Sequence, residues 1–433
     1  MLSRISSATC LGIDACLVEI EVDVSNGLPQ VTIVGLPDQA VRESKERVRS
    51  ALKNSGFPIA PRKITINLAP ADIKKEGPAY DLAIALGILA SSGFLKQNEL
   101  HKFLFTRELA LDGGLRRIKA ALPIANLARR KNLSLVLPEP NGEETNLMEG
   151  ASIFTAKTLA EVIRWINGEG ELTKVHTGWQ MARSKISPTD DCDFSEVKGQ
   201  FHAKRAAEIA ASGMHNLLLI GPPGAGKTMI AKRLPSILPE LNRFEYLEIA
   251  KIYSATGLTT DLSSLKRPFR APHHTISQIG LVGGGSIPRP GEITLAHGGI
   301  LFLDEFPEFR RDAIEALRSP MEEGLILISR AKMNLVFPAQ FLTVSAMNPC
   351  PCGYLTSPKR ACRCTMSQIQ KYHQKISGPI LDRIDLHVEM PAIEYKDLAN
   401  QIPQESSEEI RKRVAKAREI QTKRFAGNPG KTN

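Results

Sequence analysis

The sequence predicts a chain of the α/β class with two domains, and three patterns support this fold class. Strand-like runs such as QVTIVGL and KITINLA alternate with helix-like runs in the first part of the chain. Further on, HNLLLIGPPGAGKTMIAKRLPSIL has the pattern of a buried strand, a glycine-rich turn and a helix. A second apolar run, ILFLDE, ends in two carboxylates. Strands that alternate with helices in this way are typical of sheets with parallel strands.

Shifts in composition predict the domain boundaries. The strand and helix patterns of the first domain, which we expect to be of the α+β type, cover residues 1–170. Residues 171–192 show no sustained period and collect polar and turn residues, which predicts a linker. The second domain, of the α/β type, is expected over residues 193–395. Residues 396–433 contain one more helical pattern, with Ser406 or Ser407 as its N-cap.

The composition is that of a globular protein and argues against membrane and secreted classes. Hydrophobic residues make up 42% of the chain and charged residues 24%. No apolar run approaches the roughly 18 residues of a membrane-spanning helix, and Asp14, Glu19 and Glu21 interrupt any signal-peptide core. The 7 cysteines are an odd number and do not resemble a secreted disulfide framework. We therefore expect a cytoplasmic protein without membrane contact.

The charge balance is basic. The formal net charge is +10 at pH 7. Such a balance suits a polyanionic partner such as nucleic acid, but it is equally compatible with a solvated surface that binds nothing. Charge alone therefore decides little, and the function has to be argued from motifs.

A phosphate-binding loop follows the first buried strand of the second domain. The pattern G-x-x-x-x-G-K-[ST] is matched by Gly221, Pro222, Pro223, Gly224, Ala225, Gly226, Lys227 and Thr228. In this pattern the backbone N–H groups surround the β-phosphate of a nucleotide, Lys227 reaches the β- and γ-oxygens, and the hydroxyl of Thr228 holds Mg²⁺. An ordinary glycine-rich turn is the alternative, but the strand before the loop and the helix after it favour ATP and Mg²⁺ as ligands.

The second buried strand supplies two carboxylates. Asp304 and Glu305 end the run ILFLDE. We expect Asp304 to be the Mg²⁺ partner and Glu305 to polarise the attacking water, because phosphoryl transfer depends mostly on positioning and charge stabilisation. The alternative is that two acidic residues merely end a strand and face solvent.

Two further residues are candidates for ATP hydrolysis. Asn348 ends the strand-like run QFLTVSAMN, where its amide can contact the γ-phosphate or hold the water, although an asparagine there is also a common turn former. Arg383, in GPILDRIDLHVEM, is either a structural ion-pair partner or a guanidinium presented to the γ-phosphate of a neighbouring subunit. Spacing along the chain does not decide between these roles.

Several segments of the second domain resemble the AAA+ ATPases, specifically the magnesium-chelatase branch, and most of all the ComM/YifB family. The segments are VKGQFHAKRAAEIAASGMHNLLLIGPPGAGKT, RPFRAPHHTIS, GEITLAHGGILFLDE, AMNPCPCGY and GPILDRIDLHVE. The resemblance implies that Asn348 is the first sensor of nucleotide state and that Arg383 is an arginine finger acting in trans. It also implies a ring of identical subunits, usually a hexamer.

Four cysteines are clustered directly after Asn348. Cys350, Cys352, Cys362 and Cys364 follow the pattern C-x-C-x9-C-x-C. Four thiolates in two close pairs, joined by a turn-rich loop, can converge on one Zn²⁺ in a tetrahedral arrangement. Only one residue separates the two cysteines of each pair, against two in the usual C-x2-C pattern of zinc sites. A redox-active pair or inert thiols are the alternatives to a zinc site. We expect a structural Zn²⁺ that holds the loop in a defined shape.

The first domain resembles the peptidase domain of Lon-type proteases, which has an S5 domain 2-like fold. The similar segments are INLAPADIKKEGPAYDLAIALGILASSG and ELALDGGLRRIKAALPIANLARRKNLSLVLPEPN. In that family a glycine-proline pair precedes the nucleophilic serine, whereas here Gly77 and Pro78 precede Ala79. The partner lysine aligns near Leu122, with Lys119 close by. Without the hydroxyl no acyl-enzyme can form, so we expect no proteolysis.

Basic segments of the second domain are candidates for DNA contact. The run GLILISRAKMNLVFPAQF predicts a hairpin of Leu325–Ser329 against Met333–Phe337 with a basic tip, which either binds DNA backbone or protects a sheet edge. His273 and His274 are adjacent and form a poor metal chelate, so structural or polar contacts are expected for them. Three arginines of this domain either contact the phosphates of the DNA backbone or face solvent: Arg267, Arg270 and Arg289.

The resemblance implies a Mg²⁺-dependent ATPase that assembles as a ring and moves on branched DNA, promoting branch migration in recombination during natural transformation. It also implies that residues 396–433 are the start of a helical lid, and we assign no second sensor arginine there. One alternative is a chelatase-like ATPase that remodels a protein partner. The other is a module that binds nucleotide without hydrolysing it.

Overall fold

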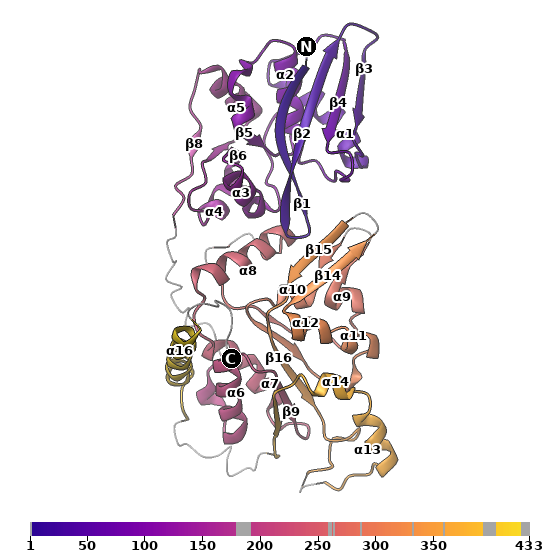
Figure 1. Ribbon diagram of the computed structural model, residues 1–433, viewed down its shortest axis with the longest axis vertical. Coiled ribbons are helices and arrows are strands. Elements are labelled where there is room, and N and C mark those ends of the chain that lie inside the picture. Colours follow the sequence, from indigo (N-terminus) through magenta and orange to yellow (C-terminus); the bar gives the residue numbers. More distant parts are fainter. Residues whose placement is uncertain are drawn as a thin grey trace. The chain divides into compact units, whose positions relative to one another are not determined.

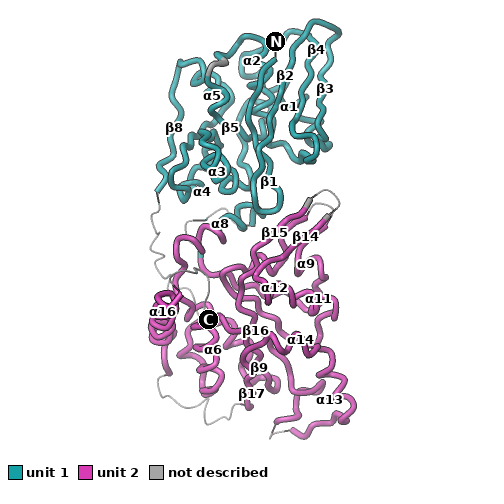
Figure 2. Tube along the Cα trace, viewed as in Figure 1, with its two compact units in different colours: residues 1–182, 250–265, 331–333 teal, residues 183–249, 266–330, 334–433 magenta. Residues whose placement is uncertain are grey.

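The computed structural model describes residues 2–178, 192–258, 262, 265–285, 288–330, 333–357, 360–392 and 404–425. These residues form two compact units (Figure 2). Unit 1 comprises residues 1–182, 250–265 and 331–333, and unit 2 comprises residues 183–249, 266–330 and 334–433. Each unit has a sheet and a hydrophobic core of its own.

Unit 1 is built on a mixed sheet with the strand order β3-β4-β2-β1-β5-β6-β7-β8 (Figure 1). Neighbouring strands are antiparallel in the pairs β1/β2, β2/β4 and β7/β8 and parallel in the others. Its strands are β1 (Leu2–Leu11), β2 (Asp14–Ser25), β3 (Gln30–Val34), β4 (Lys63–Ala69), β5 (Phe103–Phe105), β6 (Ser134–Pro138), β7 (Ile153–Ala156) and β8 (Thr173–Lys174).

One helix of unit 1 packs against β1 and β2 and is entirely buried. Every residue of α2 (Asp81–Ser91) is buried, as expected for a helix that is apolar on all sides. Asp81, at its first position, is compensated by Arg47, whose Nε lies 2.8 Å from Oδ2 of Asp81. The other helices of the unit are α1 (Gln39–Asn54), α3 (Ala121–Arg130), α4 (Gly142–Thr145) and α5 (Leu159–Asn167).

One short strand lies inside the segment that we expected to be a linker. Thr173 and Lys174 form β8, which pairs with β7 at the edge of the sheet of unit 1. A strand of two exposed residues has no periodicity that a sequence pattern could reveal. Residues 179–191 of the expected linker lie outside the described part of the chain.

Unit 2 is built on five parallel strands in the order β10-β13-β16-β9-β17. All residues of β13 and β16 are buried, as is usual for parallel strands that are covered on both faces. The strands are β9 (Leu217–Ile220), β10 (Phe269–Arg270), β13 (Ile300–Leu303), β16 (Leu342–Met347) and β17 (Leu386–Glu389). Two small sheets pair β11 (Gly283–Gly284) with β12 (Arg289–Pro290), and β14 (Leu325–Arg330) with β15 (Met333–Pro338).

The helices of unit 2 fall into a longer and a shorter group. The longer ones are α6 (Phe201–Gly213), α7 (Lys227–Ile237), α13 (Met366–His373) and α16 (Ser407–Arg424), together with α8 (Arg243–Thr256), whose residues from 250 on are grouped with unit 1. The short ones are α9 (Gln278–Val282), α10 (Glu292–Leu295), α11 (Arg311–Glu315), α12 (Arg318–Glu323) and α14 (Gly378–Leu381). Helix α16 packs against α6 and α7 through Ile410 and Val414.

Candidate functional site

The predicted nucleotide-binding residues follow three neighbouring strands of the unit 2 sheet. The phosphate-binding loop follows β9, Asp304 follows β13 and Asn348 follows β16. Because β13, β16 and β9 are adjacent and parallel, their carboxyl ends lie at one edge of the sheet. Open α/β sheets bind their ligands at this edge. The strand order therefore brings together side chains that are far apart in the sequence.

Two glycines set the backbone path of the loop from Gly221 to Thr228. Gly224 and Gly226 have positive φ angles of 80° and 92°, which glycine adopts without steric cost. Gly226 is the N-cap of α7, so Lys227 and Thr228 stand in the first turn of that helix. Residues 224–229 line a cavity of about 310 Å³. A helix N-terminus with free N–H groups beside a cavity is suited to an anion such as a phosphate.

Lys227 is held by three oxygen atoms. Its Nζ donates hydrogen bonds to the carbonyl of Gly221 at 2.6 Å, to the carbonyl of Pro222 at 3.0 Å and to Oδ1 of Asn348 at 3.1 Å. Burial lowers the pKa of Lys227 below its ordinary value, and the charge of Asp304 acts in the opposite direction. The contact with Asn348 links the phosphate-binding loop directly to the end of β16.

Thr228 and Asp304 form the candidate Mg²⁺ site. The hydroxyl of Thr228 donates a hydrogen bond of 2.9 Å to Oδ2 of Asp304. A hydroxyl and a carboxylate at this separation are the oxygen ligands that Mg²⁺ prefers, and Mg²⁺ commonly keeps only one or two protein ligands besides water and phosphate oxygens. The donor set of these two residues thus fits Mg²⁺.

Glu305 is held by a histidine. Nδ1 of His274 lies 3.1 Å from Oε2 of Glu305, and Glu305 itself has a left-handed backbone with φ of 52°. The neighbouring His273 has a different partner: its Nδ1 lies 3.0 Å from the hydroxyl of Thr275. Both histidines thus make polar contacts, which were expected for them.

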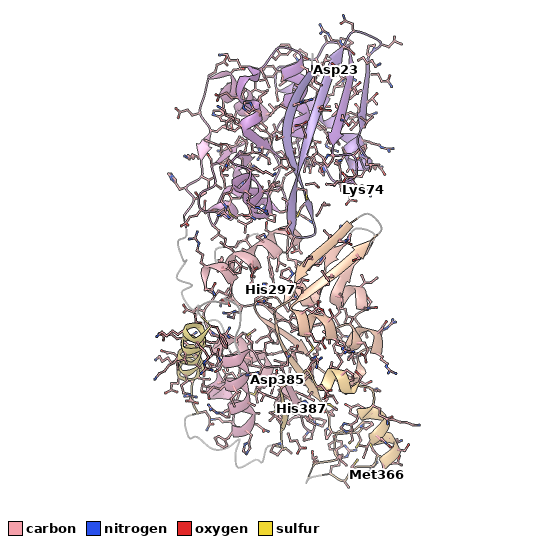
Figure 3. The ribbon with its side chains drawn as sticks, viewed as in Figure 1. Asp23, Lys74, His297, Met366, Asp385 and His387 are labelled. Atoms are coloured by element: carbon pink, nitrogen blue, oxygen red, sulfur yellow. The ribbon has the colours of Figure 1, made fainter. Side chains whose placement is uncertain are left out.

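Arg383 lies at the opposite edge of the sheet from the phosphate-binding loop. Its carbonyl accepts a hydrogen bond from Nδ2 of Asn216, the residue before β9, and Asp385 (labelled in Figure 3) accepts one from the N–H of Asn216. Asn216 and Gly221 lie on either side of β9, and the five steps of extended chain from one to the other span roughly 16 Å at the usual rise per residue. The guanidinium pairs with Glu322 of α12, with Nε donating to Oε1 at 2.7 Å. Hydrogen bonding to Arg383 lowers the pKa of Glu322.

The four clustered cysteines converge. Sγ of Cys350 lies 3.4 Å from that of Cys352 and 3.7 Å from that of Cys362, and Cys352 and Cys362 are separated by 3.6 Å. All four Sγ atoms, that of Cys364 included, lie within 4.8 Å of one another. The sequence prediction that these thiols meet at one point is thus matched by their positions, whereas the identity of a metal remains a prediction.

Two of the three arginines considered for phosphate contact have protein partners, and the third, Arg289, is exposed. Arg267 donates to the carbonyls of Pro239 and Gly298, and Arg270 forms a two-point ion pair with Glu292. The hairpin of β14 and β15 forms as predicted. Lys332, at its expected basic tip, lies outside the described residues, as do residues 393–403 and 426–433.

The residues of the expected vestigial protease site have structural contacts. The carbonyl of Ala79 accepts a hydrogen bond of 2.6 Å from the N–H of Arg107. Leu122 is fully buried, and its N–H donates to the hydroxyl of Ser254. A Cβ on Gly257 would lie 3.0 Å from the side chain of Lys119, so this lysine packs against the glycine. That the domain lacks protease activity remains a prediction.

Sequence reasoning did not find His274 as the partner of Glu305 or Glu322 as the partner of Arg383. Both pairs join residues that are distant along the chain, and neither a histidine pair nor a glutamate in a short helix is a specific signal. None of the helices in the described ranges is long and apolar enough to cross a membrane.

Comparisons with known proteins agree with the geometry. The family model "Magnesium chelatase, subunit ChlI" matches residues 193–398, and the model "Subunit ChlI of Mg-chelatase" matches residues 20–141. The chain is 44% identical to "Competence protein ComM" of Haemophilus influenzae over 425 residues, which are 98% of this chain and 83% of that protein. It is 43% identical to "Uncharacterized protein YifB" of Escherichia coli with the same coverage.

The N-terminal part also has a more distant relative. "Lon protease 2" of Bacillus subtilis is 28% identical over 146 residues, which are 32% of this chain and 26% of that protein. The mixed α/β fold of unit 1 is in keeping with this similarity. The long matches to ComM and YifB, together with the parallel sheet and loop geometry of unit 2, lead to one conclusion: the chain belongs to the ComM/YifB family of magnesium-chelatase-like AAA+ proteins.

Proposed function

We propose that this protein is a Mg²⁺-dependent ATPase whose site lies at the carboxyl ends of β9, β13 and β16. One observation carries the proposal: the Lys227–Asn348 and Thr228–Asp304 hydrogen bonds, of 3.1 and 2.9 Å, join the three strand ends into one cluster beside the cavity of the loop. This arrangement supplies positioning and charge stabilisation, which are what phosphoryl transfer requires.

Each residue of the cluster has a separate task. The ammonium of Lys227 and the backbone N–H groups of residues 226–228, at the start of α7, bind the β- and γ-phosphates of ATP. Bound at Thr228 and Asp304, Mg²⁺ would neutralise charge on the phosphate oxygens. Glu305 orients the attacking water and accepts its proton, and Asn348 fixes the position of Lys227 and contacts the γ-phosphate. A separate Zn²⁺ on the four cysteines has no part in this chemistry.

We propose that Arg383 completes the site of a neighbouring subunit. Its backbone is attached at the amino edge of the sheet through Asn216, and this position supports a role at a site other than that of its own chain. An arginine supplied in trans stabilises charge in the transition state. A ring of identical subunits, most simply a hexamer, places each Arg383 beside the next nucleotide. The pair with Glu322 is then the resting position of this guanidinium.

We propose DNA, in particular branched DNA, as the partner on which the ring acts in the cytoplasm. The net charge of +10 and the β14–β15 hairpin support this assignment, and the name of the Haemophilus relative refers to competence. ATP-driven movement of the ring along DNA would promote branch migration during recombination and natural transformation. A cationic ring binds the DNA backbone without reading its sequence.

A chelatase-like ATPase that remodels a protein partner is the second candidate, because the family models that match carry the magnesium-chelatase description. A protein remodeller has no physical reason to respond to a DNA junction. Binding of nucleotide without turnover is the third outcome that the site geometry permits, since the same contacts hold ATP in all three cases.

The test is steady-state ATP hydrolysis by this chain, with and without a four-way DNA junction and with linear duplex as a control. We expect turnover that the junction stimulates and that Glu305→Gln lowers by about 100-fold or more, while nucleotide binding is retained. Turnover that is indifferent to DNA would favour the remodelling ATPase. Bound nucleotide without turnover would overturn the ATPase assignment.

A further inference from the structure

The four cysteines of the loop between β16 and α13 bring the two ends of this loop close together. The chain leaves β16 at Met347, passes Cys350 and Cys352, and returns through Cys362 and Cys364 to the start of α13. Within this turn the Sγ atoms of Cys350, Cys352 and Cys362 are separated from one another by 3.4, 3.6 and 3.7 Å. A disulfide needs about 2.05 Å, and all four cysteines are free.

These separations match one tetrahedral Zn²⁺. With Zn–S bonds of 2.3 Å, the edge of a ZnS₄ tetrahedron is about 3.8 Å. Four thiolates leave no open coordination position, which is the property of a structural rather than a catalytic site. Within the second pair of thiols, the N–H of Cys364 donates a hydrogen bond of 3.4 Å to Sγ of Cys362.

The first arm of the loop contacts the nucleotide site twice. Asn348, which accepts the hydrogen bond from Lys227, precedes Cys350 by two residues. Gly353, with φ of +84°, lies so close to the phosphate-binding loop that an added Cβ would be 2.8 Å from Cδ of Pro223. A side chain therefore cannot be accommodated at this contact without a shift of one loop or the other.

The part of the loop that contains Cys362 and Cys364 leads into α13, and the end of this helix contacts Asn348. Helix α13 begins one residue after Thr365, whose hydroxyl and backbone complete a capping box with Gln368. At the other end of this helix, the phenol of Tyr372 is hydrogen-bonded to the backbone of Asn348, and burial raises its pKa to about 12. Nε2 of His373 lies 3.1 Å from the carbonyl of Pro349. Asn348 and Pro349, at the start of the cysteine loop, are thus joined to the helix that follows the loop.

We propose that Cys350, Cys352, Cys362 and Cys364 hold one structural Zn²⁺, and that this ion fixes Asn348 and the Gly353–Pro223 contact in the positions that nucleotide binding requires. The first half of the proposal is independent of the enzymatic activity. The second half rests on the proposed function, because it concerns the geometry of the same nucleotide site. A loop of this length has few apolar residues with which to keep its shape, and metal-binding free energy can replace a core.

Metal content tests the first half. The full chain, purified under reducing conditions and freed of loose metal by gel filtration, should carry about one Zn²⁺ per chain by elemental analysis. Chain refolded with Co²⁺ should show the visible absorption of a tetrahedral cobalt–thiolate centre. Cys352→Ser with Cys362→Ser should lose the metal, and the matched control, Cys10→Ser with Cys16→Ser, should retain it. A chain without Zn²⁺ and without the Co²⁺ spectrum, or one with disulfides among these four residues, would overturn the site.

Nucleotide binding tests the second half. Removal of Zn²⁺ from the folded wild-type chain with a thiol-modifying mercurial should weaken ATP binding by about tenfold, roughly the effect of one hydrogen bond to a charged group. Gly353→Ala should weaken ATP binding comparably while keeping its Zn²⁺, and Gly378→Ala, at a glycine whose Cβ would meet nothing within 4 Å, should change neither. Unchanged ATP affinity after Zn²⁺ removal would refute the coupling even if ATP hydrolysis were absent, since only binding is measured.

Discussion

At the scale of single residues, Lys227 and Glu305 are the groups whose surroundings matter most. Each is held by a residue that is distant in the sequence: Asn348 accepts a hydrogen bond from Lys227, and His274 contacts Glu305. A hydrogen bond to a charged group contributes roughly 1.5 to 3 kcal/mol, so the contact between Asn348 and Lys227 is strong enough to affect ATP binding. The burial of Lys227 and the contact between His274 and Glu305 each lead to a prediction.

Alkaline pH should weaken ATP binding through Lys227. Burial lowers the pKa of this ammonium, so the free chain loses the proton at a pH below the ordinary value of about 10.4. The charged form binds phosphate, and hence the Kd for ATP should be constant at neutral pH and rise as the pH passes through the lowered pKa. Titration of a fluorescent ATP analogue would measure this rise.

Lys227→Ala is the control for the titration. Its weaker residual binding should show no alkaline rise of the same size, because the titrating group is gone. An identical pH dependence in this variant would assign the effect to another group.

His274 should act as a positioning residue for Glu305. Without the contact of 3.1 Å, the half-exposed carboxylate samples more orientations, and we expect His274→Ala to lower kcat by about tenfold, which is about 1.4 kcal/mol, with little change in KM. His274→Asn, which keeps a donor, should recover part of the activity. His273→Ala is the matched control, because His273 contacts Thr275 instead. Equal effects of the two alanine variants would argue against this role.

At the scale of elements, α16 is attached to unit 2 by a buried side and a capped end. Its N-cap Ser406 forms a capping box with Glu409, and the hydroxyl of Ser407 accepts a hydrogen bond from the N–H of Phe194. Ile410 and Val414 are buried in the core that also contains α6 and α7. The helix has mostly polar residues, so its position depends on this narrow apolar contact rather than on an amphipathic pattern of its own.

Truncation of the buried contact should release α16. We expect Ile410→Ala to destabilise the docked helix by about 2 to 4 kcal/mol and to speed hydrogen exchange across residues 404–425. Ile420→Ala is the matched control in the same helix: Ile420 is 53% exposed, whereas Ile410 is 2% exposed. The control should change stability by less than about 0.5 kcal/mol. Similar exchange in the two variants would contradict the packing described for α16.

At the scale of the whole molecule, the proposed ring requires that sites be completed between chains. The nucleotide cluster and Arg383 stand at opposite edges of one sheet. A chain alone would then bind ATP but turn it over slowly, and assembly would supply the missing guanidinium. The ion pair between Arg383 and Glu322 has to break before Arg383 can reach the neighbouring nucleotide, since the same N–H groups cannot bind a carboxylate and a phosphate at once.

Mixed rings should test this arrangement. Arg383→Ala and Lys227→Ala should each be nearly inactive alone, the first with ATP binding intact. Mixed in equal amounts, they should regain a measurable part of the wild-type rate, because an intact Lys227 site meets an intact Arg383 from the neighbouring chain. A mixture of Lys227→Ala with Glu305→Gln is the control and should remain inactive, since both changes affect the same site. A mixture of the first two variants that stays inactive would refute the trans role.

The sequence by itself determined the local units: the phosphate-binding loop between a strand and a helix, the apolar strand ending in Asp304 and Glu305, the hairpin of β14 and β15, and the paired spacing of the four cysteines. Short-range patterns specify such units because turns, caps and buried strands depend on neighbouring residues. The tertiary structure alone decided which units meet. The order β10-β13-β16-β9-β17 brings Asn348 to Lys227, and packing pairs His274 with Glu305 and Arg383 with Glu322. Sheet order and side-chain pairing over long separations arise from the burial of whole surfaces, which no local pattern encodes.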